Sequence, residues 1–255
     1  MPDLRDPWKV RIAPLEGIKR VRPGDDLSRL INEAISRKGL LAEDGDIVVV
    51  TQKVVSKSEG RLVKLAGVKP GRRARKLASE LGKDPRLVEL VLREARRVVR
   101  KGHGVLITET HHGFVCANSG IDQSNVERGY VALLPVDPDR SARKIRMELQ
   151  KLTGKRLAVV VTDTFGRPWR EGQVDVALGC SGISPLSRLI GKTDPYGYRL
   201  RVTAPAIVDE VASGAELVMR KLALVPAVLV RGVEHRPSNK GAKSLVRERA
   251  FDLFR

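Results

Sequence analysis

An uninterrupted apolar run at residues 157–161 leads directly into Thr-Asp-Thr at 162–164. A run this short and this rich in valine predicts a β-strand that is buried on both faces. Gly166 and Pro168 follow, and they predict that regular structure ends here. Asp163, with a hydroxyl on either side, is therefore expected at the mouth of a buried strand, where α/β proteins often bind ligands. A strand-ending turn, in which Asp163 only accepts backbone hydrogen bonds, is an equally good interpretation of this stretch alone.

Two arginines, Arg167 and Arg170, follow Asp163 within the same expected loop. A carboxylate can hold a divalent cation, and neighbouring arginines can bind a phosphate or a substrate carboxylate. The three side chains together are typical of a metal–phosphate site. Arg167 is therefore a candidate catalytic residue, chosen only for its proximity to Asp163.

The rest of the chain mixes short strands with helices in an irregular order. Helical spacing of apolar residues predicts helices at 27–35, 74–81, 87–99, 141–152 and 207–222, and a terminal helix after a loop in the tail. There is no GxxxxGK[ST] loop and no GxGxxG motif. We therefore expect a mixed α/β (α+β) fold with irregular mixed sheets and flanking helices, neither Rossmann nor P-loop. Short apolar or alternating runs predict further strands at 9–15, 47–50, 105–110, 114–117, 130–135, 174–179, 200–202 and 226–232.

The 255 residues are enough for one large domain or two small ones, and no repeat or low-complexity linker divides them. The formal net charge of +18 is typical either of an arginine-rich surface or of a protein with a polyanionic ligand. Asn and Gln are scarce, with four of each, as in many thermophilic proteins. Aromatic residues make up only 4%, which argues against a base-stacking surface and makes nucleic acid an unlikely partner.

Features of membrane and exported proteins are missing from the sequence. Residues 1–6 contain no apolar signal core, and no apolar run approaches 18 residues. Cys116 and Cys180 are the only cysteines, and their spacing fits neither a zinc site nor a disulfide framework. We expect a cytoplasmic protein with no membrane partner.

Two further polar segments follow predicted strands. Lys53 and Lys57 lie in the segment 51–61, where they could meet phosphates, although a solvated connection is the better interpretation of this segment alone. The octet 118–125 is polar or glycine except for one isoleucine, and its Asp122 could bind a metal or form an Asx turn. The arginine-rich helices between 71 and 101 most simply present solvated faces, with a nucleic-acid surface as the alternative.

Four stretches, taken in order and at their separations, resemble the coenzyme F420-0:γ-L-glutamyl ligase family. They are residues 14–18, 56–61, 118–126 and 162–167 with 170–172. Residues 196–200, 209–210 and 226–232 are similar to the family as well. The resemblance covers the chain from about residue 10 to about residue 232. It implies one ligase domain over residues 1–255, with two packed lobes as an alternative and 233–255 as a basic C-terminal segment.

The resemblance implies a GTP-dependent ligase that joins L-glutamate through amide bonds to the lactyl-phosphate end of coenzyme F420-0. GTP would phosphorylate a substrate carboxylate, and the glutamate amine would displace phosphate from the acyl phosphate. The expected cofactors are Mg²⁺ or Mn²⁺, with two ions expected and K⁺ as a further candidate. The expected partners are GTP, L-glutamate, F420-0 and a second copy of the chain.

The resemblance also implies roles for individual residues. Asp122, Asp163 and Thr164 match metal ligands, and Asp163 and Lys57 are catalytic candidates beside Arg167. Residues 220–225 contain no glycine and no acid, where the family usually has a glycine-rich loop. This departure raises the alternative of a related ligase with a different acid acceptor. The nucleotide-binding candidates are Leu15, Glu16, Gly17, Ile18, Gln52, Lys53, Lys57 and Asn125.

Overall fold

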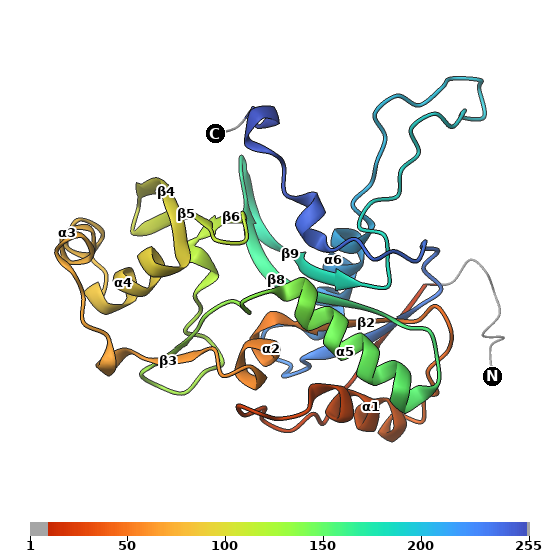
Figure 1. The fold of residues 1–255 in the computed structure, drawn as a ribbon, viewed down its shortest axis with the longest axis horizontal. Coiled ribbons are helices and arrows are strands. Elements are labelled where there is room, and N and C mark those ends of the chain that lie inside the picture. Colours follow the sequence, from red (N-terminus) through yellow and green to blue (C-terminus); the bar gives the residue numbers. More distant parts are fainter. Residues whose placement is uncertain (1–9, 254–255) are drawn as a thin grey trace.

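The computed structural model describes residues 10–253, and a five-stranded mixed sheet forms its centre (Figure 1). The strand order is β1-β10-β2-β8-β9, in which only the β2–β8 pair is parallel. The prediction of a mixed α/β fold is confirmed. The strands are β1 (Arg11–Pro14), β2 (Ile47–Thr51), β8 (Ala158–Arg167), β9 (Arg170–Ser181) and β10 (Ala227–Arg231).

Helices cover both faces of this sheet, because the central strands are apolar on both sides. Val48 and Val50 pack into a core with α1 (Leu27–Arg37) and α5 (Pro138–Thr153). Ile47 and Val49 point the other way, into a core with α6 (Ile207–Met219). Successive residues of a strand alternate between faces, so a continuous apolar run supplies both cores at once.

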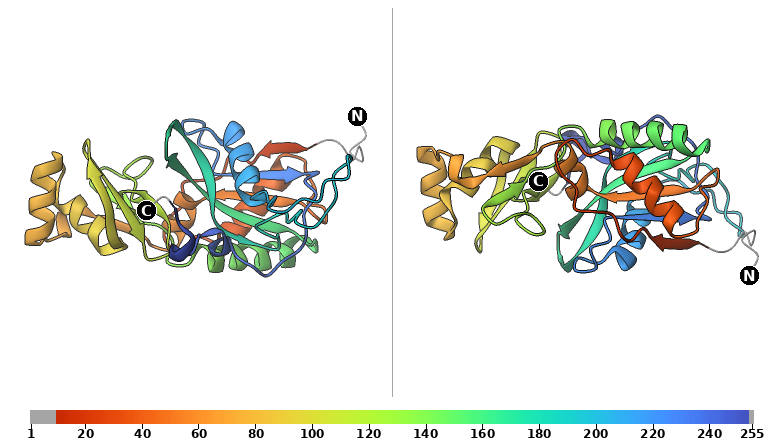
Figure 2. Two further views of the ribbon diagram at one scale, coloured as in Figure 1. Left: turned by 90° about the horizontal axis from the view of Figure 1, so that it is seen from above. Right: turned by 90° about the horizontal axis from the view of Figure 1, so that it is seen from below.

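A second group of elements lies at one end of the elongated molecule (Figure 2). It contains a three-stranded antiparallel sheet of order β4-β5-β6, packed with two helices, and a separate pair of strands, β3 and β7. A small apolar cluster around Val88, Val91 and Leu106 holds the helices to this sheet. The elements are β3 (Leu62–Lys64), α3 (Arg72–Leu81), α4 (Pro85–Glu94), β4 (Ala95–Gly102), β5 (Val105–Thr110), β6 (Val115–Ala117) and β7 (Tyr130–Ala132).

Two predictions about the segments that follow β2 and Val161 were wrong. The segment after β2 is a helix, α2 (Gln52–Ser58), and not a solvated connection, because Gln52, Val55 and Ser56 are buried against the body. Strand β8 does not end at residue 161 but continues to Arg167, paired throughout with β9. Asp163 therefore lies inside a strand rather than in a loop beyond it.

Three other predicted elements differ from the structure. Residues 98 and 99 belong to β4, which pairs with β5, so the helix predicted at 87–99 ends at Glu94. No strand forms at 200–202, which lies in a long loop between β9 and α6 that projects from the body (Figure 1). The described part of the tail contains the 3₁₀ turns η3 (Ala242–Leu245) and η4 (Arg249–Phe251) in place of an α-helix.

The N-terminal residues 1–9, where no signal core is expected and where the first predicted strand begins, lie outside the described residues. Among the helices that are described, none combines the length and the hydropathy needed to cross a membrane.

Candidate active site

A cavity of about 640 Å³ lies where the central sheet meets the second group of elements. Its walls come from α2, the polar segment after β6, the middle of the β8–β9 pair and the loop after α6. Residues 18–21 complete the lining. Segments that are far apart in the sequence therefore meet at one place.

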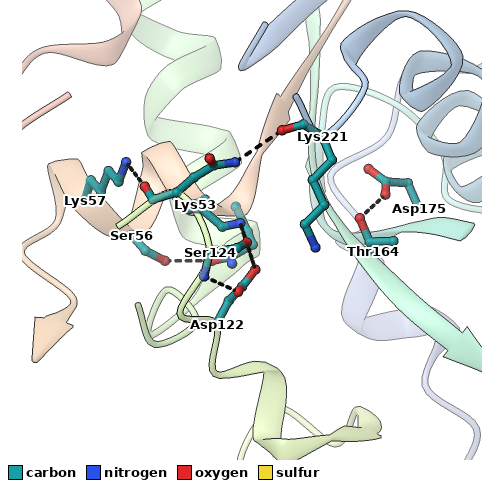
Figure 3. Close-up of polar contacts among 10 residues, drawn as sticks. Lys53, Ser56, Lys57, Asp122, Ser124, Thr164, Asp175 and Lys221 are labelled. Carbon is teal, nitrogen blue, oxygen red and sulfur yellow. Dashed lines mark hydrogen bonds and ion pairs between the residues drawn. The ribbon is translucent and has the colours of Figure 1, made fainter. Parts of the chain in front are cut away.

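Asp122 lies in one wall of the cavity, where its side chain contacts a lysine and a serine (Figure 3). Its carboxylate lies 2.7 Å from Lys53 Nζ and accepts hydrogen bonds from the backbone N–H of Ser124 at 2.6 Å and from its hydroxyl at 2.9 Å. Burial acts to raise the pKa of Asp122, but the hydrogen bonds from Lys53 and Ser124 outweigh it and hold the pKa below its usual value. The backbone of Asp122 is fixed as well, by a pair of hydrogen bonds to Ala132.

Lys57 and Asn125 form the neighbouring part of the wall. Lys57 Nζ donates to the backbone carbonyl of Asn125 at 2.7 Å, and the Asn125 side chain donates to the carbonyl of Lys221 at 3.3 Å (Figure 3). Burial lowers the pKa of Lys57, and the nearby charges of Arg20 and Lys53 lower it further. The wall thus concentrates positive charge, which suits the binding of an anion.

Asp163 lies in the floor of the cavity, in the middle of β8. Burial raises the pKa of Asp163 to about 7, and the negative charges of Asp122 and Asp175 add to this effect. The backbone of Thr164 and the charge of Lys53 act in the opposite direction. Asp163 is therefore a carboxylate that would be stabilised in its ionised form by an additional cation.

Asp175 is a site residue that the sequence did not single out. It is almost fully buried in β9, where it accepts hydrogen bonds from the hydroxyls of Thr162 at 3.0 Å and Thr164 at 2.7 Å. Burial raises the pKa of Asp175, and these two hydrogen bonds oppose the rise. The sequence did offer a sign of this residue, because Asp175 is the only charged residue in the predicted strand 174–179. Its carboxylate fixes the orientation of the Thr164 hydroxyl.

The structure brings most of the predicted residues to this cavity. Ile18, Lys53, Lys57, Asp122, Asn125, Asp163 and Thr164 all line it.

The remaining predicted residues lie elsewhere. Leu15 belongs to the apolar core, Glu16 pairs with Lys38 at 2.9 Å, and Gly17 accepts a hydrogen bond through its carbonyl from Arg37. The buried Gln52 accepts a hydrogen bond from Ser56. None of these four residues lines the cavity.

Arg167 and Arg170 lie at the tip of the β8–β9 hairpin, outside the cavity lining. Arg167 donates to the carbonyl of Glu171 at 2.6 Å. Because β8 continues past Asp163, the hairpin carries both arginines away from the carboxylate that suggested them.

The donor set fits a hard divalent cation. Asp122, Asp163 and Thr164 offer only oxygen ligands, which Mg²⁺ and Mn²⁺ prefer, and Asp163 lacks a strong charge partner of its own. Within residues 10–253, no three His, Cys, Asp or Glu side chains are already grouped to hold a metal. In this arrangement Lys53 is the charge partner of Asp122.

A model of the F420-0:Gamma-glutamyl ligase family matches residues 17–232, which is most of the chain. The chain belongs to this family. Proteins named "Coenzyme F420:L-glutamate ligase" are similar to it over nearly its full length. The protein of Methanothermobacter thermautotrophicus is 46% identical, over 96% of this chain and 99% of the relative.

Two other relatives with the same name agree. The protein of Methanopyrus kandleri is 45% identical, over 96% of this chain and 98% of the relative, and that of Methanocaldococcus jannaschii is 40% identical, over 99% of each. The resemblance found in the sequence is confirmed, and the family of F420-0 ligases identifies this chain as an amide-forming ligase. The cavity gathers the acids and lysines described above.

Proposed function

We propose that this protein joins L-glutamate by an amide bond to coenzyme F420-0 in a reaction driven by GTP. The observation that carries the proposal is one cavity in which Asp122 and Asp163 face Lys53 and Lys57, in a chain related to named F420 ligases. Phosphoryl transfer depends mostly on positioning and on neutralisation of charge, and these side chains can supply both.

The reaction has two steps. A carboxylate oxygen of the acceptor attacks the terminal phosphorus of GTP, which releases GDP and leaves an acyl phosphate. The amine of L-glutamate then attacks the acyl carbon, phosphate departs, and the amine loses a proton as the amide forms. We expect Lys57 and Lys53 to exchange their present contacts for phosphate oxygens. Asn125 links this wall to the loop after α6 through its hydrogen bond to the Lys221 carbonyl.

Asp122, Asp163 and Thr164 would hold Mg²⁺ or Mn²⁺, which supplies charge neutralisation to the phosphates when bound. Asp175 accepts a hydrogen bond from the Thr164 hydroxyl, which leaves the lone pairs of the hydroxyl oxygen free for a cation. We expect two ions, and K⁺ is a further candidate. Asp175 and Glu216 add two further carboxylates to the cavity lining.

We also propose that the protein is a homodimer. The long loop between β9 and α6 exposes large side chains, with Tyr196 96% and Val202 85% accessible, and Trp169 at the hairpin tip is 78% accessible. Exposed apolar side chains of this size on projecting segments are typical of surfaces that another chain covers. Light scattering that gave the mass of one chain at micromolar concentration would contradict the dimer.

The activity can be tested directly by mass spectrometry. Purified protein is incubated with F420-0, L-glutamate, Mg²⁺ and GTP, and the expected product carries at least one added glutamyl residue. Asp122→Asn should lower the rate by at least about 100-fold, because it removes a charge that organises the cavity. Glu33→Gln, an exposed change on the outer side of α1, is the matched control and should leave the rate unchanged.

Two results would contradict the proposal in different ways. Full activity of Asp122→Asn would show that the cavity has been assigned wrongly. A glutamyl product formed only from an acid other than F420-0 would favour the alternative of a related ligase. That alternative is prompted by residues 220–225, which place Arg220 and Lys221 in the cavity lining.

A further inference from the structure

Lys221 lies in the loop after α6, and no role has been assigned to it above. Figure 3 shows its side chain extending into the space between Asp122 on one side and the Thr164–Asp175 pair on the other. The backbone that carries it is held by the hydrogen bond from Asn125 to its carbonyl. The loop therefore directs an ammonium group into the cavity.

The backbone of this loop is unusual. Arg220 and Leu224, which flank Lys221 and line the cavity, have φ angles of 44° and 55°, in the left-handed region that side chains other than glycine rarely adopt. Such conformations persist only where the surrounding structure imposes them, and they concentrate at functional sites. The lysine is thus presented by a constrained segment and not by a flexible tail.

The charge of Lys221 acts on the acids around it. Burial raises the pKa of Asp175 and of Glu216, and the charge of Lys221 opposes the rise for both. Among the residues that the structure describes, none forms a hydrogen bond or an ion pair with the Lys221 ammonium group. The other three lysines of the lining differ. Lys53 is paired with Asp122, Lys57 donates to the Asn125 carbonyl, and Lys19 is paired with Asp25.

Lys53 and Lys57 would have to give up these contacts in order to bind a polyphosphate, whereas Lys221 has no such contact to lose within the described part of the chain. A polyphosphate carries several negative charges, and Asp122, Asp163, Asp175 and Glu216 already line the space. Repulsion from these acids would oppose the binding of a nucleotide without a divalent cation. A free ammonium group between the acids reduces this repulsion and can contact a phosphate oxygen directly.

We propose that Lys221 binds an anionic oxygen of the nucleotide's phosphates and thereby allows the nucleotide to bind without a divalent cation. The inference rests on the proposed function, because it takes GTP as the ligand. It makes Lys221 a determinant of nucleotide binding in this chain, and it assigns to a side chain part of the charge neutralisation that a metal ion would supply.

The experiment measures GTP affinity by calorimetry, once with Mg²⁺ and once in EDTA. The wild-type protein should bind GTP in both conditions. Lys221→Met should weaken binding in EDTA by at least about tenfold, as expected for loss of one charged contact, and should weaken binding with Mg²⁺ clearly less. Lys221→Arg should stay within about threefold of wild type, and Lys64→Met, an exposed change on β3, should match wild type.

A role as a mere counter-ion of Asp175 and Glu216 predicts a different pattern. Lys221→Met would then change the unfolding temperature of the ligand-free protein but would leave GTP affinity in EDTA unchanged, and this result would overturn the inference. Binding of GTP that requires Mg²⁺ even in the wild type would overturn it too. Absence of GTP binding in both conditions would instead overturn the proposed function, so the two failures are distinguishable.

Discussion

The pKa of Asp163 leads to a sharp prediction about stability. In the folded protein, burial raises this pKa to about 7. In the unfolded chain, the side chain has the ordinary value of 3.8. The folded protein therefore binds a proton that the unfolded chain releases between about pH 4 and pH 7. Stability consequently falls as pH rises through this window, and the loss is complete above about pH 7.

The magnitude follows from the size of the shift. A difference of about 3 pKa units corresponds to at most about 4 kcal/mol, since one unit is worth about 1.4 kcal/mol. Part of the side chain faces the cavity, so water reduces this figure. Asp163→Asn removes the titration, and we expect its free energy of unfolding to rise relative to wild type by about 2–3 kcal/mol between pH 5 and pH 8.

Urea unfolding in EDTA, followed at several pH values, measures this difference without interference from bound metal. Asp25→Asn is the control, because the pKa of Asp25 is shifted in the opposite direction. A hydrogen bond from the backbone N–H of Arg22 lowers this pKa most, and a hydrogen bond from Lys19 lowers it further. Asp25 is therefore ionised above pH 5 in both the folded and the unfolded protein. The difference in free energy of unfolding between Asp25→Asn and wild type should stay constant from pH 5 to pH 8. A constant difference for Asp163→Asn as well would refute the reasoning.

Three further predictions follow from other contacts. Gly179→Ala should destabilise the protein by at least about 2 kcal/mol in urea unfolding, because an added Cβ would overlap the backbone carbonyl at the start of α5. Arg231→Met should cost about 3–5 kcal/mol in the same assay, because it leaves the buried carboxylate of Asp46 without the partner now 2.7 Å away. Thr164→Val removes the hydroxyl that donates a hydrogen bond to Asp175, and we expect at least about a tenfold loss of ligase rate with little change in overall fold by circular dichroism.

Local sequence patterns predicted much of the architecture. The apolar runs at 47–50 and 226–232 form central strands, and the helical stripes at 27–35 and 141–152 form the helices that cover one face. These predictions succeeded because the burial of a strand or helix is encoded in the spacing of its own residues. Where β-branched residues continued a helical stripe, as at 98 and 99, pairing with β5 overrode the local pattern.

The candidate site was predicted only in part. Asp122, Asp163 and Lys57 were singled out because polar residues follow apolar runs. The metal role of Thr164 and the nucleotide role of Asn125 came from the family resemblance. Arg167 was chosen because it is close to Asp163 in the sequence. Since β8 continues to Arg167, this closeness in sequence does not bring the two side chains to the same place.

The sequence by itself determined the buried strands, most of the helices and the family. The strands and helices follow from the spacing of apolar residues that are close together in the chain, and the family follows from the order of its motifs. The tertiary structure alone decided that β8 continues past Val161, since the hydrogen bonds of that extension come from β9. It also decided that Asp175 and Lys221 face the same cavity as Asp163. Segments separated by dozens of residues set these positions by packing together, and no local pattern records that contact.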